Sequence, residues 1–110
     1  MPVATKEVRA TVAAVLGERA ALPRFEEVEE AVLFLRGHMM LLIPEIEDLS
    51  RLRPKDDLVV ILALAGVGEA RRKLRMSPGP GLVSAVEHAK HLARSCDALL
   101  RHYELLVEEA

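Results

Sequence analysis

Apolar side chains recur in alternating steps of three and four residues along two long stretches of this 110-residue chain. In the first stretch they are Phe25, Val28, Val32, Leu35, Met39, Leu42, Ile46 and Leu49. In the second stretch they are Leu82, Ala85, Ala89, Leu92, Cys96, Leu99, Tyr103 and Leu106. This spacing keeps an apolar stripe on one side of an α-helix for about three and a half heptads, as in long helices packed nearly parallel or antiparallel. It predicts an all-α fold.

Two further segments complete the predicted fold. Val8, Val12 and Leu16 have helical spacing near the start of the chain, and residues 58–68 are apolar without interruption. We expect a single domain, residues 1–110, and its helices at about residues 5–20, 24–52, 56–76 and 82–108. Because the connections between the last three helices are short, neighbouring helices should be antiparallel. The sequence therefore predicts an antiparallel four-helix bundle.

Prolines and aspartates mark the predicted helix boundaries. Pro23 suits the first turn of the second helix, and Asp56 or Asp57 can cap the third. Pro44 lies inside the second helix and should kink or split it, because proline cannot donate the helical hydrogen bond.

Charged side chains at the helix ends make the topology testable. In an antiparallel pair, the acidic start of the second helix should lie within ion-pair distance of the basic end of the third. The acidic side chains are Glu26, Glu27 and Glu30, and the basic ones are Arg71, Arg72 and Arg75. The same basic cluster could instead receive an anionic ligand, but pairing and compensation of the helix dipole also explain it.

The segment LVVILALAGVG, residues 58–68, has no charge and no hydroxyl group. A membrane span needs about 20 apolar residues, so this segment is too short to cross a bilayer. Its Gly66-x-Gly68 pattern is the start of a dinucleotide-binding fingerprint, but Arg71 occupies the position of the third small residue. No second strand-like segment exists to form the sheet that such a site needs. We therefore expect a helix whose glycines allow close contact with a neighbour.

A helix that is apolar on every side must be covered on several sides. The second helix also has apolar residues away from its main stripe. We therefore expect a protein–protein interface across these two helices, since large apolar patches are uncommon on monomers. The expected interface residues are Leu33, Phe34, Met40, Leu41, Val60, Leu64 and Val67. Phe34 should be the anchor, because buried aromatic side chains often dominate interface energetics.

Composition excludes several classes of function. The net charge is −2 and there are only three aromatic residues, so neither phosphate neutralisation nor base stacking is supported, and we expect no nucleic-acid partner. We expect no membrane partner either, because no apolar run is long enough. Lys6 and Arg9 precede a short apolar run, but its helical spacing favours a helix over a leader peptide. The single Cys96 fits a reducing cytoplasm.

Histidines are the main candidates for chemistry. Glu87, His88 and His91 lie close in sequence, yet the helical frame spreads them across the outer face, so we expect no metal and no cofactor. Cys96 falls in the apolar stripe and should be inert. The alternative to an interaction protein is a small-molecule-binding or catalytic bundle. It would use His38, His88 or His102 in a pocket between helices.

Four sequence segments carry a resemblance: LRGHMMLLIPEIEDL (35–49), ALAGVGEARRKL (63–74), PGPGL (78–82) and HAKHLARSCDALLRHYELL (88–106). They resemble a family of small actinobacterial proteins of unknown function, whose members are named only for natural-product biosynthesis. The resemblance implies a cytoplasmic helical protein of bacterial secondary metabolism and supplies no catalytic residue. We therefore expect a non-catalytic accessory subunit. Its partner should be a larger biosynthetic enzyme, which it stabilises through an apolar helical face, or a second copy in a homo-oligomer.

Overall fold

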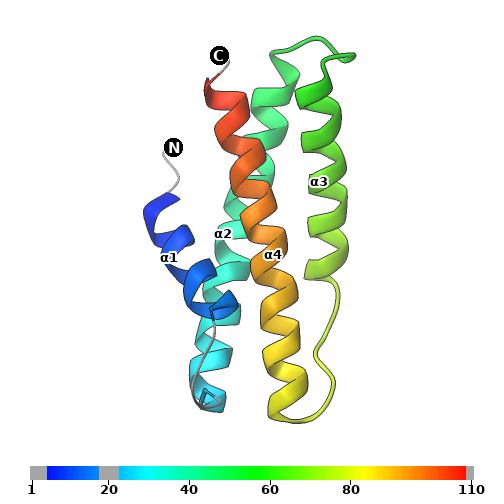
Figure 1. The fold of residues 1–110 in the computed structure, drawn as a ribbon. Helices are drawn as coiled ribbons and strands as arrows, with labels where there is room; N and C mark the ends of the chain where they lie inside the picture. Colours follow the sequence, from blue (N-terminus) through cyan, green and yellow to red (C-terminus); the bar gives the residue numbers. More distant parts are fainter. Residues whose placement is uncertain (1–4, 18–22, 109–110) are drawn as a thin grey trace.

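The computed structural model describes residues 5–17 and 23–108, and this part of the chain is helical without any strand. The helices are α1 (Thr5–Leu16), α2 (Phe25–Arg51), α3 (Leu58–Leu74) and α4 (Gly81–Glu108) (Figure 1). The all-α prediction is confirmed, and the helix boundaries agree to within a few residues. The predicted end of the first helix, residues 18–20, lies outside the described residues.

The helices form an antiparallel bundle built around one central pair. α2 and α4 pack against each other along most of their length, whereas α1 and α3 lie on opposite sides of this pair (Figure 1). Each helix runs opposite to the one before it in the chain. Within the described ranges α1 and α3 do not touch. Because α3 sits at one flank, only its inner side is covered.

The two apolar stripes predicted from the sequence meet inside this central pair. Their fully buried side chains, at most 1% exposed, are Leu35, Met39, Leu42 and Ile46 of α2 and Leu92, Cys96, Leu99 and Leu106 of α4. α1 contributes Val8 and Val12, and α3 contributes Val60, Ala63 and Val67. The core is therefore almost wholly aliphatic.

Pro44 does not split α2, which continues through it as one helix. The proline ring removes only the hydrogen bond to the carbonyl of Met40. Pro44 and Met40 are both exposed, so water can hydrogen bond to that carbonyl instead. The helix therefore tolerates the proline on its solvent side.

Both ends of α3 are fixed by specific side chains. At its start, the Asp57 carboxylate accepts a hydrogen bond of 2.8 Å from the backbone N–H of Val59, which confirms the predicted cap. Partial burial acts to raise the pKa of Asp57, but hydrogen bonds from Arg53 and Val59 outweigh it, and the pKa lies below its ordinary value. At its end, Arg36 of α2 donates a 2.9 Å hydrogen bond to the carbonyl of Leu74.

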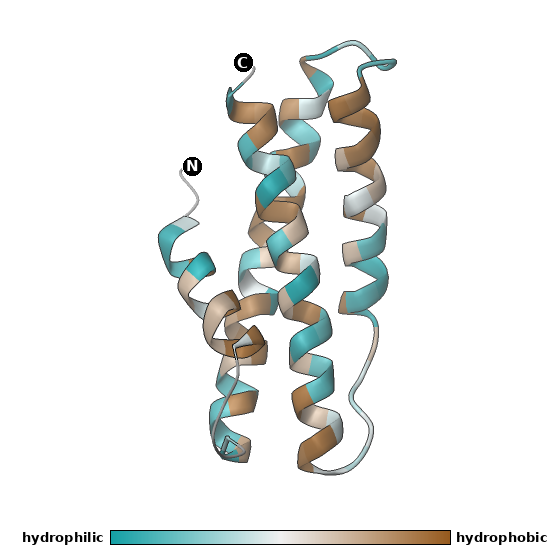
Figure 2. Ribbon diagram, in the orientation of Figure 1, coloured by the Kyte–Doolittle hydropathy of each residue, from teal (hydrophilic) through white to brown (hydrophobic). Residues whose placement is uncertain are grey.

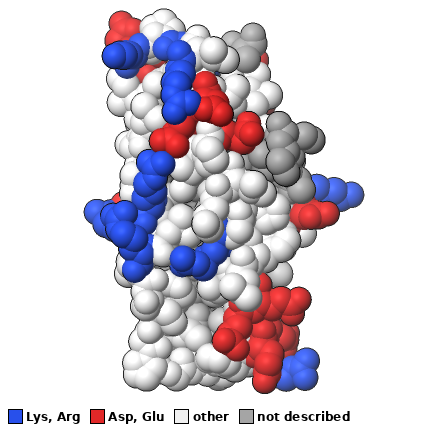
Figure 3. Space-filling view, turned by 180° about the vertical axis from the view of Figure 1, so that it is seen from behind, with Lys and Arg blue, Asp and Glu red and all other residues white. Residues whose placement is uncertain are grey.

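The predicted contact between the acidic and basic clusters is wrong. α2 has 27 residues and α3 has 17, and the Arg36–Leu74 hydrogen bond places the end of α3 beside the middle of α2. The start of α2, residues 26–30, therefore extends beyond α3. Figure 3 shows acidic side chains gathered near that end of the molecule, apart from most of the basic ones. Arg71 instead pairs with Glu47 at 3.1 Å, and Arg72 pairs with Glu69 of its own helix.

Close packing at the glycines of α3 is confirmed for one of the two. A Cβ atom at Gly66 would lie 2.7 Å from Cδ2 of His102 on α4, so the imidazole ring would have to shift to admit a larger residue. A Cβ atom at Gly68 would have no neighbour within 4 Å. α3 therefore approaches a side chain of α4 closely at Gly66 and not at Gly68.

Candidate functional site

The outward side of α3 carries a group of exposed apolar side chains. Its first half exposes four large apolar side chains and one alanine, which we call the α3 face: Leu58, Ile61, Leu62, Leu64 and Ala65. Leu58, Ile61, Leu62 and Ala65 recur at steps of three, one and three residues, and therefore form one continuous stripe. Figure 2 shows this half of α3 as strongly hydrophobic and the other half as mixed.

The reason for the exposure is the position of α3 in the bundle. Val60, Ala63 and Val67 point inward and are at most 3% exposed. The opposite side has no neighbouring helix in the described ranges, because α1 lies across the central pair. Leu58 is 66% exposed and Leu62 52%. A segment apolar on all sides is thus covered on one side only.

The predicted interface residues fall into three groups. Leu33, Met40, Leu41 and Leu64 are exposed, Phe34 is partly exposed, and Val60 and Val67 are buried. Including Val60 and Val67 was wrong, because these side chains fill the core between α3 and its neighbours. The ring of Phe34 packs against that of His38, with centroids 4.3 Å apart, and so part of its surface is already covered.

The exposed residues of α2 lie on two adjoining sides of the helix. Leu33 and Met40 share a helical side with Arg36 and Glu47, which both bond to α3. Leu41 follows Phe34 by seven residues, and this side is turned by about 100° from the first. The α2 residues therefore lie on two adjoining sides of the helix, and the side of Leu33 and Met40 borders α3. A joint interface of these residues with α3 stays a prediction.

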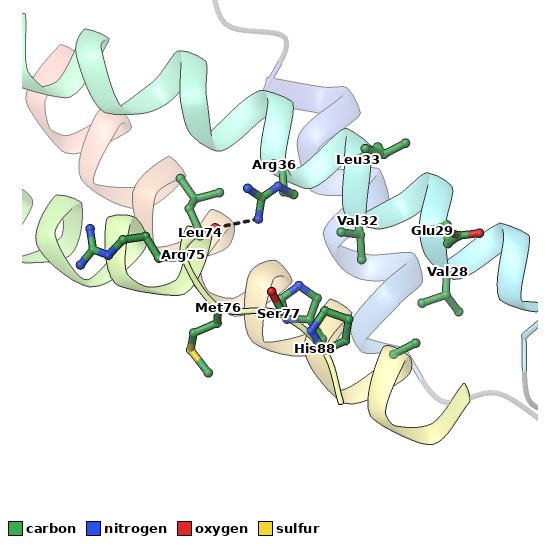
Figure 4. Close-up of a pocket in the computed structure, with 12 residues that line it drawn as sticks. Val28, Glu29, Val32, Leu33, Arg36, Leu74, Arg75, Met76, Ser77 and His88 are labelled. Atoms are coloured by element: carbon green, nitrogen blue, oxygen red, sulfur yellow. Dashed lines mark hydrogen bonds between the residues drawn. The ribbon is translucent and has the colours of Figure 1, made fainter. Parts of the chain in front are cut away.

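A second feature is a cleft of about 510 Å³ between the start of α2, the end of α3 and the start of α4. The apolar floor of the cleft is formed by Val28, Val32 and Ala85. Its polar lining residues are Glu29, Arg36, Arg75, Ser77 and His88. Residues 75–80, which connect α3 to α4, run beside α4 and close one side (Figures 1 and 4). In Figure 4 the side chain of Arg75 points away from the cleft, whereas Arg36 reaches across to Leu74.

His88 is the one predicted histidine that lines this cleft. It is 8% exposed, and its ring makes no hydrogen bond to any described residue. Burial lowers its pKa below the ordinary histidine value, and the nearby charges of Arg36 and His91 lower it further. The ring is therefore neutral at pH 7 and can both donate and accept a hydrogen bond. The sequence-based placement of His88 on the outer face was wrong.

The other two histidines lie elsewhere. His102 packs against Gly66, and burial, followed by the charge of Arg101, lowers its pKa. His38 lies beside Phe34, and its buried Nδ1 has no hydrogen-bond partner. The structure thus separates the three histidines. No group of three potential metal-ligating side chains occurs among residues 5–17 and 23–108. No helix in these ranges is both long enough and apolar enough to cross a bilayer.

Comparison with protein families places almost the whole sequence in one family. The model of a family of unknown function, DUF6415, matches residues 6–108. The chain belongs to this family. No curated protein and no solved structure matches the chain. The match to DUF6415 includes α1, which lies outside the four segments quoted in the sequence analysis. The family has no assigned activity. The surfaces of the molecule are therefore the basis for a functional proposal.

Sequence reasoning missed four members of the α3 face, Leu58, Ile61, Leu62 and Ala65, and most of the cleft. Leu58, Ile61 and Leu62 were inside the segment identified as excessively apolar, but nothing in its pattern separated the inward from the outward residues. The cleft depends on the path of residues 75–80, which have no periodicity. The combination of Arg36 with His88, 52 positions apart in the sequence, became visible only in three dimensions.

Proposed function

We propose that this DUF6415 protein is a non-catalytic accessory subunit that binds a larger protein through the α3 face. The supporting observation is the continuous exposed stripe of Leu58, Ile61, Leu62 and Ala65, flanked by Leu64. Because the sequence resembles proteins named for natural-product biosynthesis, we propose that the partner is a cytoplasmic biosynthetic enzyme. The subunit would stabilise this enzyme by covering an apolar surface on it.

The energetic reason is the water-exposed apolar area. Full burial of a leucine or isoleucine side chain contributes about 1.5–3 kcal/mol. The large side chains of the α3 face are already roughly half buried, so a partner would recover about 1 kcal/mol from each. Four such side chains offset a substantial part of the cost of association, and complementary polar contacts around them must supply the rest.

Charge next to the α3 face favours a different protein over a second copy. Beyond the apolar half, residues 69–75 contain four basic side chains and one acidic side chain. Two parallel copies of α3 would place these basic ends together. Two antiparallel copies would place each basic end near the 51–57 connection, which has three basic and two acidic side chains and is therefore also net positive. A partner with an apolar groove continued by acidic side chains fits better.

The test is co-purification after co-expression with the products of neighbouring genes. Leu58→Glu and Ile61→Glu place a charge on the α3 face, and glutamate near the start of a helix is compatible with its dipole. Val83→Glu is the matched control, because Val83 is 65% exposed at the start of α4, at the other end of the bundle. We expect both α3 variants to lose the partner and the control to retain it, with unchanged helical content by circular dichroism.

Three results would contradict the proposal. The first is capture of the partner equally by all variants, and the second is equal loss of the partner in the Val83→Glu control. The third is a stable homo-oligomer, seen by light scattering, that only the α3 variants dissociate, which would mean that the face binds a second copy. In each case a heteromeric role of the α3 face is ruled out.

A further inference from the structure

We infer that the cleft between α2, residues 75–80 and α4 binds a small organic molecule with one carboxylate beside an apolar body. This site is separate from the α3 face and does not depend on the proposed interaction function. The inference combines an arginine without an acidic partner, a buried histidine without a hydrogen bond and an apolar floor, all lining one cleft of about 510 Å³.

Arg36 provides the charge that such a ligand needs. One of its N–H groups donates to the Leu74 carbonyl at 2.9 Å, and this bond holds the guanidinium at the cleft. A guanidinium has five N–H donors, so four remain for other acceptors. Arg36 has no carboxylate partner in the part of the chain that the structure describes. A planar carboxylate is a suitable acceptor for the N–H groups of Arg36 that do not bond to Leu74.

His88 provides a second polar contact at the same site. Its side chain is more than nine-tenths buried, yet its ring has no partner among the described residues (Figure 4). The His88 ring nitrogens are not among the fully buried atoms that lack a partner, so they open to the solvent in the cleft and are available to a ligand. A ligand carboxylate between Arg36 and His88 would accept from both, which would satisfy the imidazole and neutralise the arginine.

The other residues that line the cleft indicate what the part of the ligand beyond its carboxylate should be. Val28, Val32 and Ala85 offer apolar contacts, and the cleft volume lies within the usual range for small-molecule sites, about 300–1,000 Å³. Glu29 also lines the cleft, two helical turns before Arg36, at about 10 Å along the axis. Its negative charge disfavours a second anionic group on the ligand. The lining therefore favours an amphiphilic monocarboxylate over phosphate.

The experiment compares octanoate with octanamide and inorganic phosphate on the full chain. Isothermal titration should give saturable one-site binding of octanoate. Octanamide, which lacks the charge, should bind at least about tenfold more weakly, because hydrogen bonds to charged groups are the stronger ones. Phosphate at equal concentration should not compete. On the wild-type protein, nuclear Overhauser effects should connect octanoate to the methyl groups of Val32 and Ala85, which requires no variant.

Paired variants identify the polar contacts. Arg36→Gln and His88→Leu should each weaken octanoate binding, the former by about tenfold or more. His91→Leu and Arg94→Gln are exposed controls on α4 and should bind as the wild type does. Thermal melts check that each variant is folded.

Four outcomes would overturn the inference: no saturable binding of octanoate, octanamide binding as tightly as octanoate, phosphate competing at equal concentration, or Overhauser contacts only to methyl groups outside the cleft. If Arg36→Gln or His88→Leu does not fold, the comparison of ligands and the Overhauser contacts on the wild type still decide the question.

Discussion

The two glycines of α3 provide a sharp test of the packing, because the same substitution should have opposite consequences two residues apart. Alanine at Gly68 adds a methyl group with no neighbour within 4 Å. Alanine at Gly66 adds one that lies 2.7 Å from Cδ2 and 2.8 Å from Nε2 of His102. Both positions lie within one helix, so the intrinsic preference for alanine is the same at each.

The magnitudes follow from these distances. Replacing a glycine by alanine inside a helix gains about 0.5–1 kcal/mol when nothing clashes, so Gly68→Ala should stabilise the protein by that amount. At Gly66 ordinary contact begins near 3.4 Å, and the His102 ring would have to retreat by roughly 0.7 Å. Overpacking in a well-packed region costs about 1–3 kcal/mol. Gly66→Ala should therefore be less stable than Gly68→Ala by about 1–3 kcal/mol.

The assay is urea unfolding followed by far-UV circular dichroism at pH 8, where His102 is neutral in both states. A double-mutant cycle with His102→Ala isolates the contact. In the His102→Ala background, Gly66→Ala should become stabilising by about 0.5–1 kcal/mol, as at Gly68. Equal stabilisation by Gly66→Ala and Gly68→Ala in the wild-type background would refute the close approach of α3 and α4.

Three further predictions concern single side chains. Burial raises the pKa of the Cys96 thiol to about 12, so a thiol reagent at pH 8 should label the native protein very slowly and the urea-unfolded protein completely. The pKa of His88 is lowered in the folded state, so the unfolded state binds the proton more readily and the free energy of unfolding should fall as the pH drops from 7.5 through about 6.5. Denaturant titrations across this range should show a smaller fall in His88→Leu than in His91→Leu; an identical fall would contradict the assignment. Arg36→Gln should reduce the free energy of unfolding by about 0.5–1.5 kcal/mol through loss of the bond to the Leu74 carbonyl, and unchanged urea midpoints would show that this bond contributes nothing.

The fold could be predicted because its determinants are local and periodic. The alternating steps of three and four that include Leu35 and Leu92 mark the sides of α2 and α4 that become buried. Asp57 is recognisable as a cap from its position before an apolar run. Short connections then leave only the antiparallel arrangement. Periodicity identifies a buried side but not the neighbour that covers it, so the central pairing of α2 with α4 could not be derived.

The failed ion-pair prediction has a similar cause. It assumed that helices joined by a short turn end at the same level. The sequence does contain the information that α2 is the longer helix, but the Arg36–Leu74 contact is needed to see that α2 extends beyond α3. The positions of Glu26 and Glu30 relative to Arg71 depend on this offset, which no local pattern encodes.

The candidate site was predicted less completely than the fold. An amphipathic helix shows its inner side by contrast with polar residues, and residues 58–68 offer no such contrast. Val60 and Val67 were therefore assigned to the surface, although they lie in the core, while Ile61 was not singled out. For His88, the helical frame gave its angle correctly but could not anticipate that residues 75–80 run beside it and bury it.

The central claim is that the α3 face is covered by another protein, and site-specific photo-crosslinking in the producing cell tests it most directly. A photoreactive amino acid at position 61 probes the α3 face, and the same group at position 83 probes an exposed position at the start of α4. We predict a single heteromeric crosslink from position 61, to one larger enzyme identified by mass spectrometry, and none from position 83. Crosslinks from position 61 only to copies of the same chain, or the same products from both positions, would contradict the account.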